Sequence, residues 1–331
     1  RRLIVAQRTG DTLFCYAVGG PLQRPELEVV SEHFDTLHLT GLLPSKEVNA
    51  GDTWKLENAT TQALCLFDGL ISHDLAATLK EIAEGCAIIT IAGTAKGIEN
   101  GALATLTIEA SVRYDLLKKR LISLTWKQKD SRDQGPISPA AEVETTTTLK
   151  RELLDEEPKE LTRAALVGVP PEDDPPAVAK LLLHNEAKGR YRFLHPREWH
   201  TVAQTEHHVV LRLLDRGDFV AQATLTSWKN AGTGKHISAD EFQKLVATAP
   251  GWQMEQIVDH GEVAGDGERW AYRVTARGEL DGVKVVQNFF VIAAPSGEQI
   301  VATFTMKPGN AVRLGTRDLA IVNGIEFLGK K

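Results

Sequence analysis

Cysteine is scarce in this sequence, and its scarcity excludes several kinds of site. The chain has three cysteines, an odd number that does not form a closed disulfide framework. No Cys-x-x-Cys pair is present, which excludes a zinc ribbon and a thioredoxin-type site. We expect Cys15, Cys65 and Cys86 to be small buried residues, and a bridge between Cys65 and Cys86 stays open if the protein is exported.

An excess of positive charge and long apolar runs are also missing. The 38 Lys and Arg residues face 44 Asp and Glu residues, giving a formal net charge of −6 and no surplus of base for a phosphate backbone. Nucleic acid is therefore not an expected partner. No apolar run approaches the roughly 20 residues that a membrane-spanning helix needs. Because the sequence starts at Arg1 without a methionine, we expect that an upstream segment was cleaved or left out, and a signal peptide or lipid anchor is one candidate for it. We predict a periplasmic or secreted location.

Familiar catalytic motifs are the third absence. The sequence contains no Gly-x-Ser-x-Gly elbow, no His-Glu-x-x-His and no phosphate-binding Gly-x4-Gly-Lys-[Ser/Thr] loop. The segment 232–235 (GTGK) comes closest to the last of these, but it lacks the first glycine at the required spacing, so we expect a solvated loop. The sequence thus predicts neither a catalytic residue nor a bound cofactor.

What the chain does have is enough length and apolar content for two cores. It holds 331 residues, of which 42% are hydrophobic. Five of the fourteen prolines, together with a cluster of acids, fall within residues 151–190, and this composition is typical of a linker. We therefore predict an α+β protein with a β-rich domain over 1–150, an acidic proline-rich linker over 151–190 and a second domain over 191–331.

The first domain shows strand periodicity. Apolar residues alternate with polar ones from Ala102 to Tyr114 and again through Ile122 to Trp126, which predicts an antiparallel hairpin. Residues 86–92 and 142–149 are further strand candidates, and 64–67 also looks extended. The stretch 73–84 is ambiguous, because Leu75, Leu79 and Ile82 fit a helical stripe. We expect a curved sheet or open barrel, filled by its own side chains in preference to a small apolar ligand.

The second domain mixes strands and helices. Residues 219–226 alternate as a strand, and Ser238 with Glu241 has the spacing of a capping box that opens a helix with Phe242, Leu245 and Val246 on its apolar face. A three-strand meander follows over 270–306, then a short helix over 316–322 and a last strand over 325–328. The middle strand, 283–292, is apolar on both faces, which predicts that it is covered twice, by helices or by the other domain.

These elements resemble the PsbP-like α-β-α sandwich family, in which helices flank an antiparallel sheet. The resemblance rests on FLHPREWH at 193–200, the helix ISADEFQKLV and the strands of 269–306. It implies a non-enzymatic binding or assembly role, frequently outside the cytoplasm, and no shared catalytic residue. The first domain, through LLPSKEVNAGDTWKLEN at 42–58 and WKQKDSRDQGP at 126–136, looks like uncharacterised proteins of planctomycete-type bacteria.

Histidines offer the remaining chemical lead, because four of them crowd into fourteen residues: His195, His200, His207 and His208. A metal-assisted hydrolase would place such imidazoles on converging elements. Adjacent His207 and His208 point to opposite faces if extended, however, and no nearby carboxylate has a ligand spacing. Structural or surface roles are therefore favoured. The ligand-binding candidates that the sequence offers are Arg192, His200, His207, His208, Arg269 and Arg273.

Three hypotheses remain open at this point. The first is a binding or assembly protein that holds an unknown protein or small molecule without turning it over. The second is a hydrolase built on the His195–His208 cluster. The third is a carrier of a lipid or another apolar molecule in the first domain, which predicts a cavity on the order of several hundred cubic ångströms there.

Overall fold

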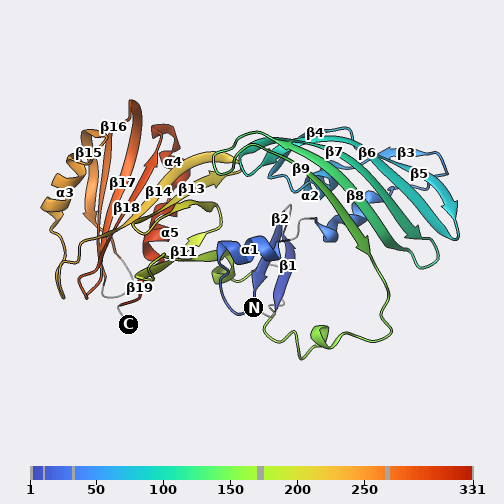
Figure 1. Ribbon diagram of the computed structural model, residues 1–331, viewed down its shortest axis with the longest axis horizontal. Helices are drawn as coiled ribbons and strands as arrows, with labels where there is room; N and C mark the ends of the chain where they lie inside the picture. Colours follow the sequence, from blue (N-terminus) through green and yellow to red (C-terminus); the bar gives the residue numbers. More distant parts are fainter. Residues whose placement is uncertain (1–2, 10–11, 32–33, 170–174, 265–268, 330–331) are drawn as a thin grey trace. The chain divides into compact units, whose positions relative to one another are not determined.

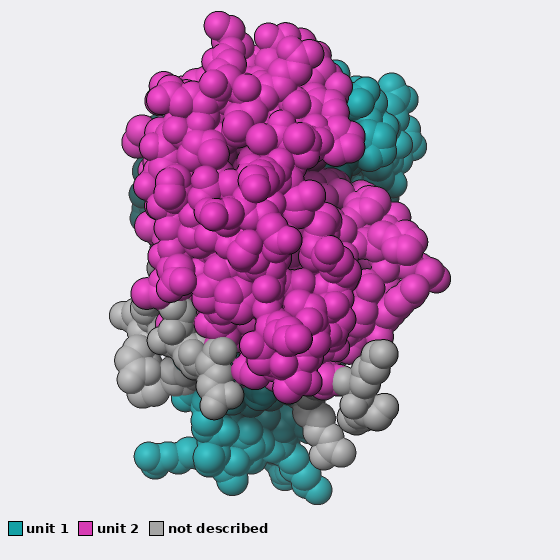
Figure 2. Space-filling model, turned by 90° about the vertical axis from the view of Figure 1, so that its left-hand side faces the viewer, with its two compact units in different colours: residues 1–19, 27–176 teal, residues 20–26, 177–331 magenta. Residues whose placement is uncertain are grey.

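Antiparallel strands dominate the computed structural model, which describes residues 3–9, 12–31, 34–169, 175–264 and 269–329. The chain divides into unit 1, residues 1–19 and 27–176, and unit 2, residues 20–26 and 177–331 (Figure 2). The border at Pro176 and Ala177 falls inside the segment predicted as a linker, and residues 170–174 of that segment lie outside the described residues. The predicted domain limits themselves stay a prediction.

Unit 1 is built on a seven-stranded antiparallel sheet that bends strongly along its length (Figure 1). The strands follow the order β3 (Thr53–Lys55), β5 (Ala76–Ala83), β6 (Cys86–Glu99), β7 (Ala102–Asp115), β8 (Arg120–Arg132) and β9 (Ala141–Lys150). The seventh strand, β4 (Gly69–His73), pairs with the C-terminal part of β6. Because β3 and β9 stand at the two ends of this order, the sheet is open, as the predicted curved sheet requires.

Alternation along β7 explains which face of this sheet forms the core. Ala104, Leu106 and Ile108 are buried, whereas Thr107 and Glu109, which flank Ile108, are exposed. The buried face packs against α2 (Asn58–Leu64) and the 3-10 helix η1 (Thr36–Leu42), and α2 lies on the inner side of the curve in Figure 1. The hairpin predicted for 102–126 is confirmed, with β7 and β8 paired from Ala104 to Asp115 and a register shift between Arg113 and Tyr114.

The ambiguous stretch 73–84 is a bulged strand. β5 pairs with β6, but its register shifts between Leu79 and Glu81, which leaves Lys80 as an extra residue. Leu79 and Ile82 therefore share a face although they are three positions apart, and this spacing imitates a helical period. The extended structure expected at 64–67 is wrong, because Leu64 ends α2 and Leu66 has a φ of 56°.

A small hairpin completes unit 1. It consists of β1 (Ile4–Thr9) and β2 (Thr12–Ala17). Arg8 of β1 forms an ion pair with the fully buried Asp35, which also caps η1 by accepting a hydrogen bond from the Leu37 N–H at 3.0 Å. Gly41, inside η1, lies so close to α2 that a Cβ there would come within 2.1 Å of the Thr60 hydroxyl oxygen. The approach of η1 to α2 therefore requires glycine at this position.

Unit 2 holds a second seven-stranded antiparallel sheet and a three-stranded one. The larger follows the order β12 (Trp199–Gln204), β13 (His208–Asp215), β14 (Asp218–Trp228), β18 (Gln299–Met306), β17 (Val283–Ala293), β16 (Trp270–Leu280) and β15 (Trp252–Glu262). The smaller joins β10 (Leu181–Asn185), β11 (Tyr191–Pro196) and β19 (Ile325–Phe327). Helices α1 (Arg24–Val30), α3 (Ala239–Ala247), α4 (Ala311–Leu314) and α5 (Arg317–Asn323) and the 3-10 turns η2 (Lys159–Leu161), η3 (Ala177–Lys180) and η4 (Pro308–Asn310) complete the chain.

The double coverage predicted for β17 is confirmed within unit 2. Phe290 on one face belongs to a core that includes Ile321 of α5, and Phe289 on the other face packs in a core with Phe242 and Val246 of α3. The capping box of Ser238 is also present and opens α3. The predicted apolar face of that helix is too wide by one residue, because Leu245 is 40% exposed.

The cysteines are buried, as expected, and Cys65 and Cys86 are free thiols, so the bridge between them that stayed open does not form in this structure. Burial raises the pKa of the Cys65 thiol to about 12, which keeps it protonated and unreactive at neutral pH. Within the described residues, no helix combines the length and apolar character that crossing a membrane requires.

Candidate binding cavity

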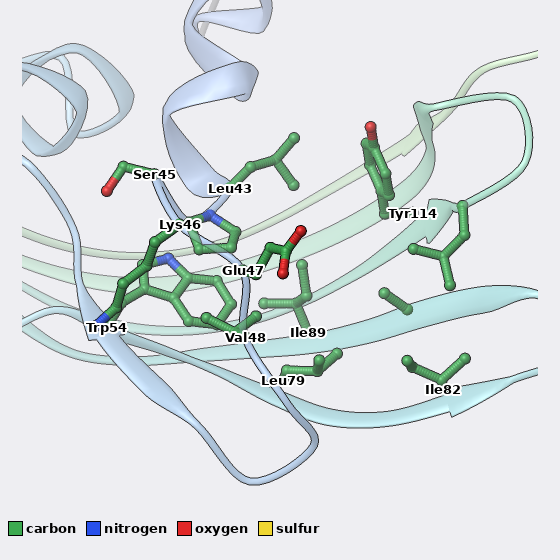
Figure 3. Close-up of a pocket in the computed structure, with 13 residues that line it drawn as sticks. Leu43, Ser45, Lys46, Glu47, Val48, Trp54, Leu79, Ile82, Ile89 and Tyr114 are labelled. Atoms are coloured by element: carbon green, nitrogen blue, oxygen red, sulfur yellow. The ribbon is translucent and has the colours of Figure 1, made fainter.

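Unit 1 contains a cavity of about 490 Å³ between the inner face of its sheet and the segment 43–48 (Figure 3). Its lining is mostly apolar. The apolar residues that line it are Leu43, Pro44, Val48, Trp54, Leu79, Ile82, Ala87, Ile89, Tyr114 and Leu116. This volume falls within the range of about 300–1,000 Å³ that small-molecule sites occupy.

Three neighbouring strands supply the floor of the cavity. Leu79 of β5 stands opposite Ile89 of β6, and Ala87 of β6 stands between Ile82 and Tyr114 of its two neighbours. The bulge at Lys80 is what allows both Leu79 and Ile82 to face inward. Small Ala87 in the middle of this set leaves room that a larger side chain would occupy.

The roof is the irregular segment 43–48, and both of its ends are anchored. At its start, the Leu43 N–H donates to the Thr40 carbonyl at 3.2 Å and so ends η1. Beyond its end, Asn49 and Asp52 form a tight turn, and the Gly51 N–H donates to the Leu79 carbonyl at 2.7 Å. The roof is thus fixed to a floor strand by backbone hydrogen bonds.

Polar residues also line the cavity, spread along its roof and at the end of β7. Ser45, Lys46 and Glu47 are exposed residues of the roof that also line the cavity, and Tyr114 adds a phenol. In Figure 3 the Glu47 carboxylate and the Tyr114 hydroxyl lie on the roof side of the apolar floor. The arrangement suits a molecule with an apolar body on the sheet and a polar end among these groups.

The histidines predicted as a site lie in unit 2, and two of them are built into its interior. His195 is 1% exposed and bonds through Nδ1 to the Pro196 carbonyl at 2.8 Å. Burial lowers the pKa of His195 to about 3 and that of His200 to about 4. Sequence analysis missed two neighbours. His184 stacks on Phe193, and burial lowers its pKa to about 4; the positive charge of Arg24 further lowers the pKa values of His195 and His200.

Arg24 explains part of this interior. Its guanidinium donates to the backbone carbonyls of Arg197 and Trp199 at 2.6 and 2.9 Å. It therefore ties residues 20–26 to the strands β11 and β12 that follow some 170 positions later in the chain. Nothing in the sequence indicated that Arg24 lies beside the histidines, because it is remote from them along the chain.

His207 and His208 occupy a turn at the surface. The Thr205 hydroxyl accepts from the N–H groups of both, at 3.1 and 3.2 Å, and lies 3.2 Å from His208 Nδ1. The described part of the chain contains no group of three or more His, Cys, Asp or Glu residues arranged to hold a metal ion. The structure does not gather His200, His207 and His208 into a ligand set.

The three candidate arginines each have partners. Arg192 forms two hydrogen bonds with Glu326, at 2.8 and 2.9 Å, across β11 and β19. Arg269 donates to the carbonyls of Ile325 and Asn323, and Arg273 pairs with Asp259. Arg273 on β16 lies four strand spacings, about 19 Å, from His208 on β13. The candidates therefore do not form one site.

Unit 2 has a hollow of its own, of about 650 Å³, beside α3. Most of the residues that line it are polar or charged, among them Lys229, His236 and Lys244. Two of its polar residues are already used for structure: Glu241 closes the capping box of α3, and Gln299 bonds to the backbone of Ile237 and Lys229. It is a weaker candidate than the apolar cavity of unit 1.

The sequence matches no protein-family model and no curated protein. Solved structures similar to the chain include a protein from Bacteroides thetaiotaomicron (TM-score 0.32, 11% identity, 45% of this chain and 48% of that chain). They also include cyanobacterial PsbP, CyanoP, from Synechocystis sp. PCC 6803 (TM-score 0.32, 15% identity, 46% and 94%) and a mutant of the protein Mog1 (TM-score 0.34, 9% identity, 45% and 97%). The chain thus spans about half the length of the Bacteroides protein. The resemblance of the second-domain sequence to the PsbP-like family and the likeness of the first domain to planctomycete-type proteins both stay predictions.

Proposed function

We propose that the protein binds a small apolar molecule, such as a lipid acyl chain, in the cavity of unit 1 and does not turn it over. The observation that carries the proposal is the cavity itself, a hollow open to solvent on one side that lies between the roof segment 43–48 and an apolar floor. A neutral or anionic polar end of the ligand would lie beside Lys46. A hydrogen-bond donor on the ligand would pair with the Glu47 carboxylate.

Simple energetics support an occupant of this kind. Each methylene moved from water to an apolar site contributes about 0.8 kcal/mol. A chain of about ten methylenes therefore contributes about 8 kcal/mol, which is comparable with the cost of immobilising a ligand, on the order of 4–15 kcal/mol. Water would fill such a space poorly, because the floor residues Leu79, Ile82, Ala87 and Ile89 offer it no side-chain hydrogen-bonding partner.

The hydrolase based on the His195–His208 cluster has less support. A general base near neutral pH needs a pKa close to the working pH. Burial moves the pKa values of His195 and His200 well below that range, and both imidazoles lie in the interior of unit 2. In the part of the chain that the structure describes, the His208 side chain contacts Thr205, and His207 interacts with the charge of Glu206.

Equilibrium binding of a fluorescent sixteen-carbon fatty acid tests the proposal. The full chain should bind the probe saturably at one site, and an unlabelled fatty acid should displace it. Val48→Trp, which fills the space below the roof, and Ile82→Arg, which places a charge at the rim, should each weaken binding at least tenfold. Ile82 is already 57% exposed, so its replacement should not disturb folding.

Leu103→Arg is the matched control. Leu103 is a partly exposed leucine on the same sheet, but it faces away from the cavity, so this variant should bind the probe like the wild type. Binding that is not saturable, or that survives Val48→Trp unchanged, would rule the proposal out.

We also propose that residues 191–331 form a PsbP-like domain and that the protein works outside the cytoplasm, in the periplasm or as a secreted protein. The order of elements from the FLHPREWH segment to β19 supports the first part. The second part rests on the resemblance of the second-domain sequence to that family, and fractionation of cells that produce the natural protein tests it.

A further inference from the structure

The turn between β7 and β8 carries an unusual combination of residues. Asp115 pairs with Arg120 across the hairpin, so Leu116, Leu117, Lys118 and Lys119 form its tip, called here the β7–β8 tip. Hairpin turns favour Gly, Asn, Asp, Pro and Ser, for conformational reasons that leucine does not meet. Leu117 is nevertheless 89% exposed and Leu116 43% exposed. Two adjacent leucines at a protruding turn call for an apolar environment outside the fold.

The tip is held firmly in this position. The Leu116 N–H donates to the Gly85 carbonyl at 3.1 Å, and the Lys118 N–H donates to the Asp115 carboxylate at 2.8 Å. Arg113 and Glu84, 3.5 Å apart, form an ion pair between the same two hairpins. The β7–β8 tip and the β5–β6 turn therefore make one rim, and the leucines are presented by a built surface.

Cations surround the leucines. Residues 113–120 contain Arg113, Lys118, Lys119 and Arg120 and one acid, Asp115, in a chain whose net charge is −6. The Asp115 carboxylate accepts a hydrogen bond from the Lys118 N–H, and Glu84 of the neighbouring turn forms an ion pair with Arg113. Among the described residues, neither Lys118 nor Lys119 forms an ion pair. Basic side chains beside exposed leucines are the composition of segments that bind anionic lipid surfaces.

The same rim bounds the cavity. Leu116 and Tyr114 of the β7–β8 hairpin and Ile82 of the β5–β6 hairpin all line it. Ile82 is 57% exposed, so apolar surface continues from the tip over the rim to the cavity floor. An apolar molecule leaving a membrane at this rim would stay in contact with apolar side chains.

We propose that the β7–β8 tip docks the protein on an anionic lipid bilayer. Leu116 and Leu117 enter the interfacial region, and Lys118, Lys119 and Arg120 contact the anionic headgroups. Docking turns the mouth of the cavity toward the bilayer, so that its apolar ligand passes between membrane and protein. This last step rests on the proposed function, whereas docking is measured without it.

Co-sedimentation of the full chain with vesicles tests docking. The protein should sediment with vesicles of phosphatidylcholine and phosphatidylglycerol at a 7:3 ratio, and much less with pure phosphatidylcholine. Leu117→Asp should reduce the partition constant for vesicle binding at least tenfold. The double variant Lys118→Glu with Lys119→Glu should do the same. Leu103→Asp, the matched control on the outer face of β7, should sediment like the wild type.

Two further measurements separate the possible outcomes. Leu117 does not line the cavity, so Leu117→Asp should bind the soluble fatty-acid probe normally in the absence of vesicles. If the wild type binds the probe but ignores anionic vesicles, docking is refuted and the proposed function stands. If it sediments with vesicles but binds no probe, docking stands and the cavity proposal fails. A tip that leaves vesicle binding unchanged when mutated, and instead captures a protein, would also overturn docking.

Discussion

Three histidines of unit 2 show how much at the residue scale depends on surroundings. His195 is buried and His184 and His200 are partly buried, and desolvation is the main cause of their lowered pKa values, about 4 for His184, 3 for His195 and 4 for His200. The sequence showed that histidines cluster near residue 200. It did not show that they are enclosed, because enclosure involves Arg24 and residues 20–26, which precede them by about half of the chain.

These histidines predict acid sensitivity. In the unfolded chain a histidine titrates near 6.5, whereas folded His195 stays neutral down to about pH 3. Between these values the unfolded state binds more protons, so the stability of unit 2 should fall as the pH drops from about 6.5, by up to about 1.4 kcal/mol per pH unit for each histidine. The lowered pKa of Glu186 also makes the folded state less stable at acid pH, whereas the raised pKa of Asp318 makes it more stable there.

His195→Asn isolates one of these contributions. The asparagine amide replaces the bond to the Pro196 carbonyl but does not titrate. Urea unfolding at pH 7 and pH 5 should show a stability loss on acidification that is smaller by about 1–2 kcal/mol in the variant than in the wild type. Equal losses in the two proteins would mean that His195 does not titrate on unfolding as described.

At the scale of elements, periodicity was a good guide where strands are regular. The long alternation of β7, the meander β16–β17–β18 and the capping box of α3 were all predicted from the sequence and are present. It failed where a strand departs from period two. The bulge in β5 gave Leu75, Leu79 and Ile82 a helical spacing, and no local signal in the sequence distinguishes the two.

The bulge makes a prediction for single-residue deletions in β5. Deleting Lys80 removes only the extra residue, so Leu79 and Ile82 keep facing inward and the melting temperature should change by a few degrees. Deleting Thr78, two positions earlier, shifts the regular part of the strand and turns buried Leu79 outward, which should cost about 3 kcal/mol or more. Thermal unfolding of the two deletion variants makes the comparison; equal damage from both would contradict the register described for β5.

At the scale of the whole molecule, composition and alternation predicted the α+β class but not the site. The length suggested two cores, whereas the described residues form three, one in unit 1 and one on each face of β17 in unit 2. The cavity follows from neither, because its roof is an irregular segment whose position is set by η1 and by hydrogen bonds to β5. The candidate residues proposed from histidine and arginine clustering lie in unit 2, whereas the cavity is lined by unremarkable aliphatic residues of unit 1.

The location of a bound apolar chain tests the central claim most directly. Crystals of the full chain grown with an equimolar sixteen-carbon fatty acid, brominated near its methyl end, would reveal the bromine by its anomalous scattering. We predict one bromine site inside unit 1, between Val48 and the floor residues Ala87 and Ile89, with the fatty acid chemically intact. Bromine bound only outside this cavity, or an empty cavity in crystals saturated with the fatty acid, would contradict the account.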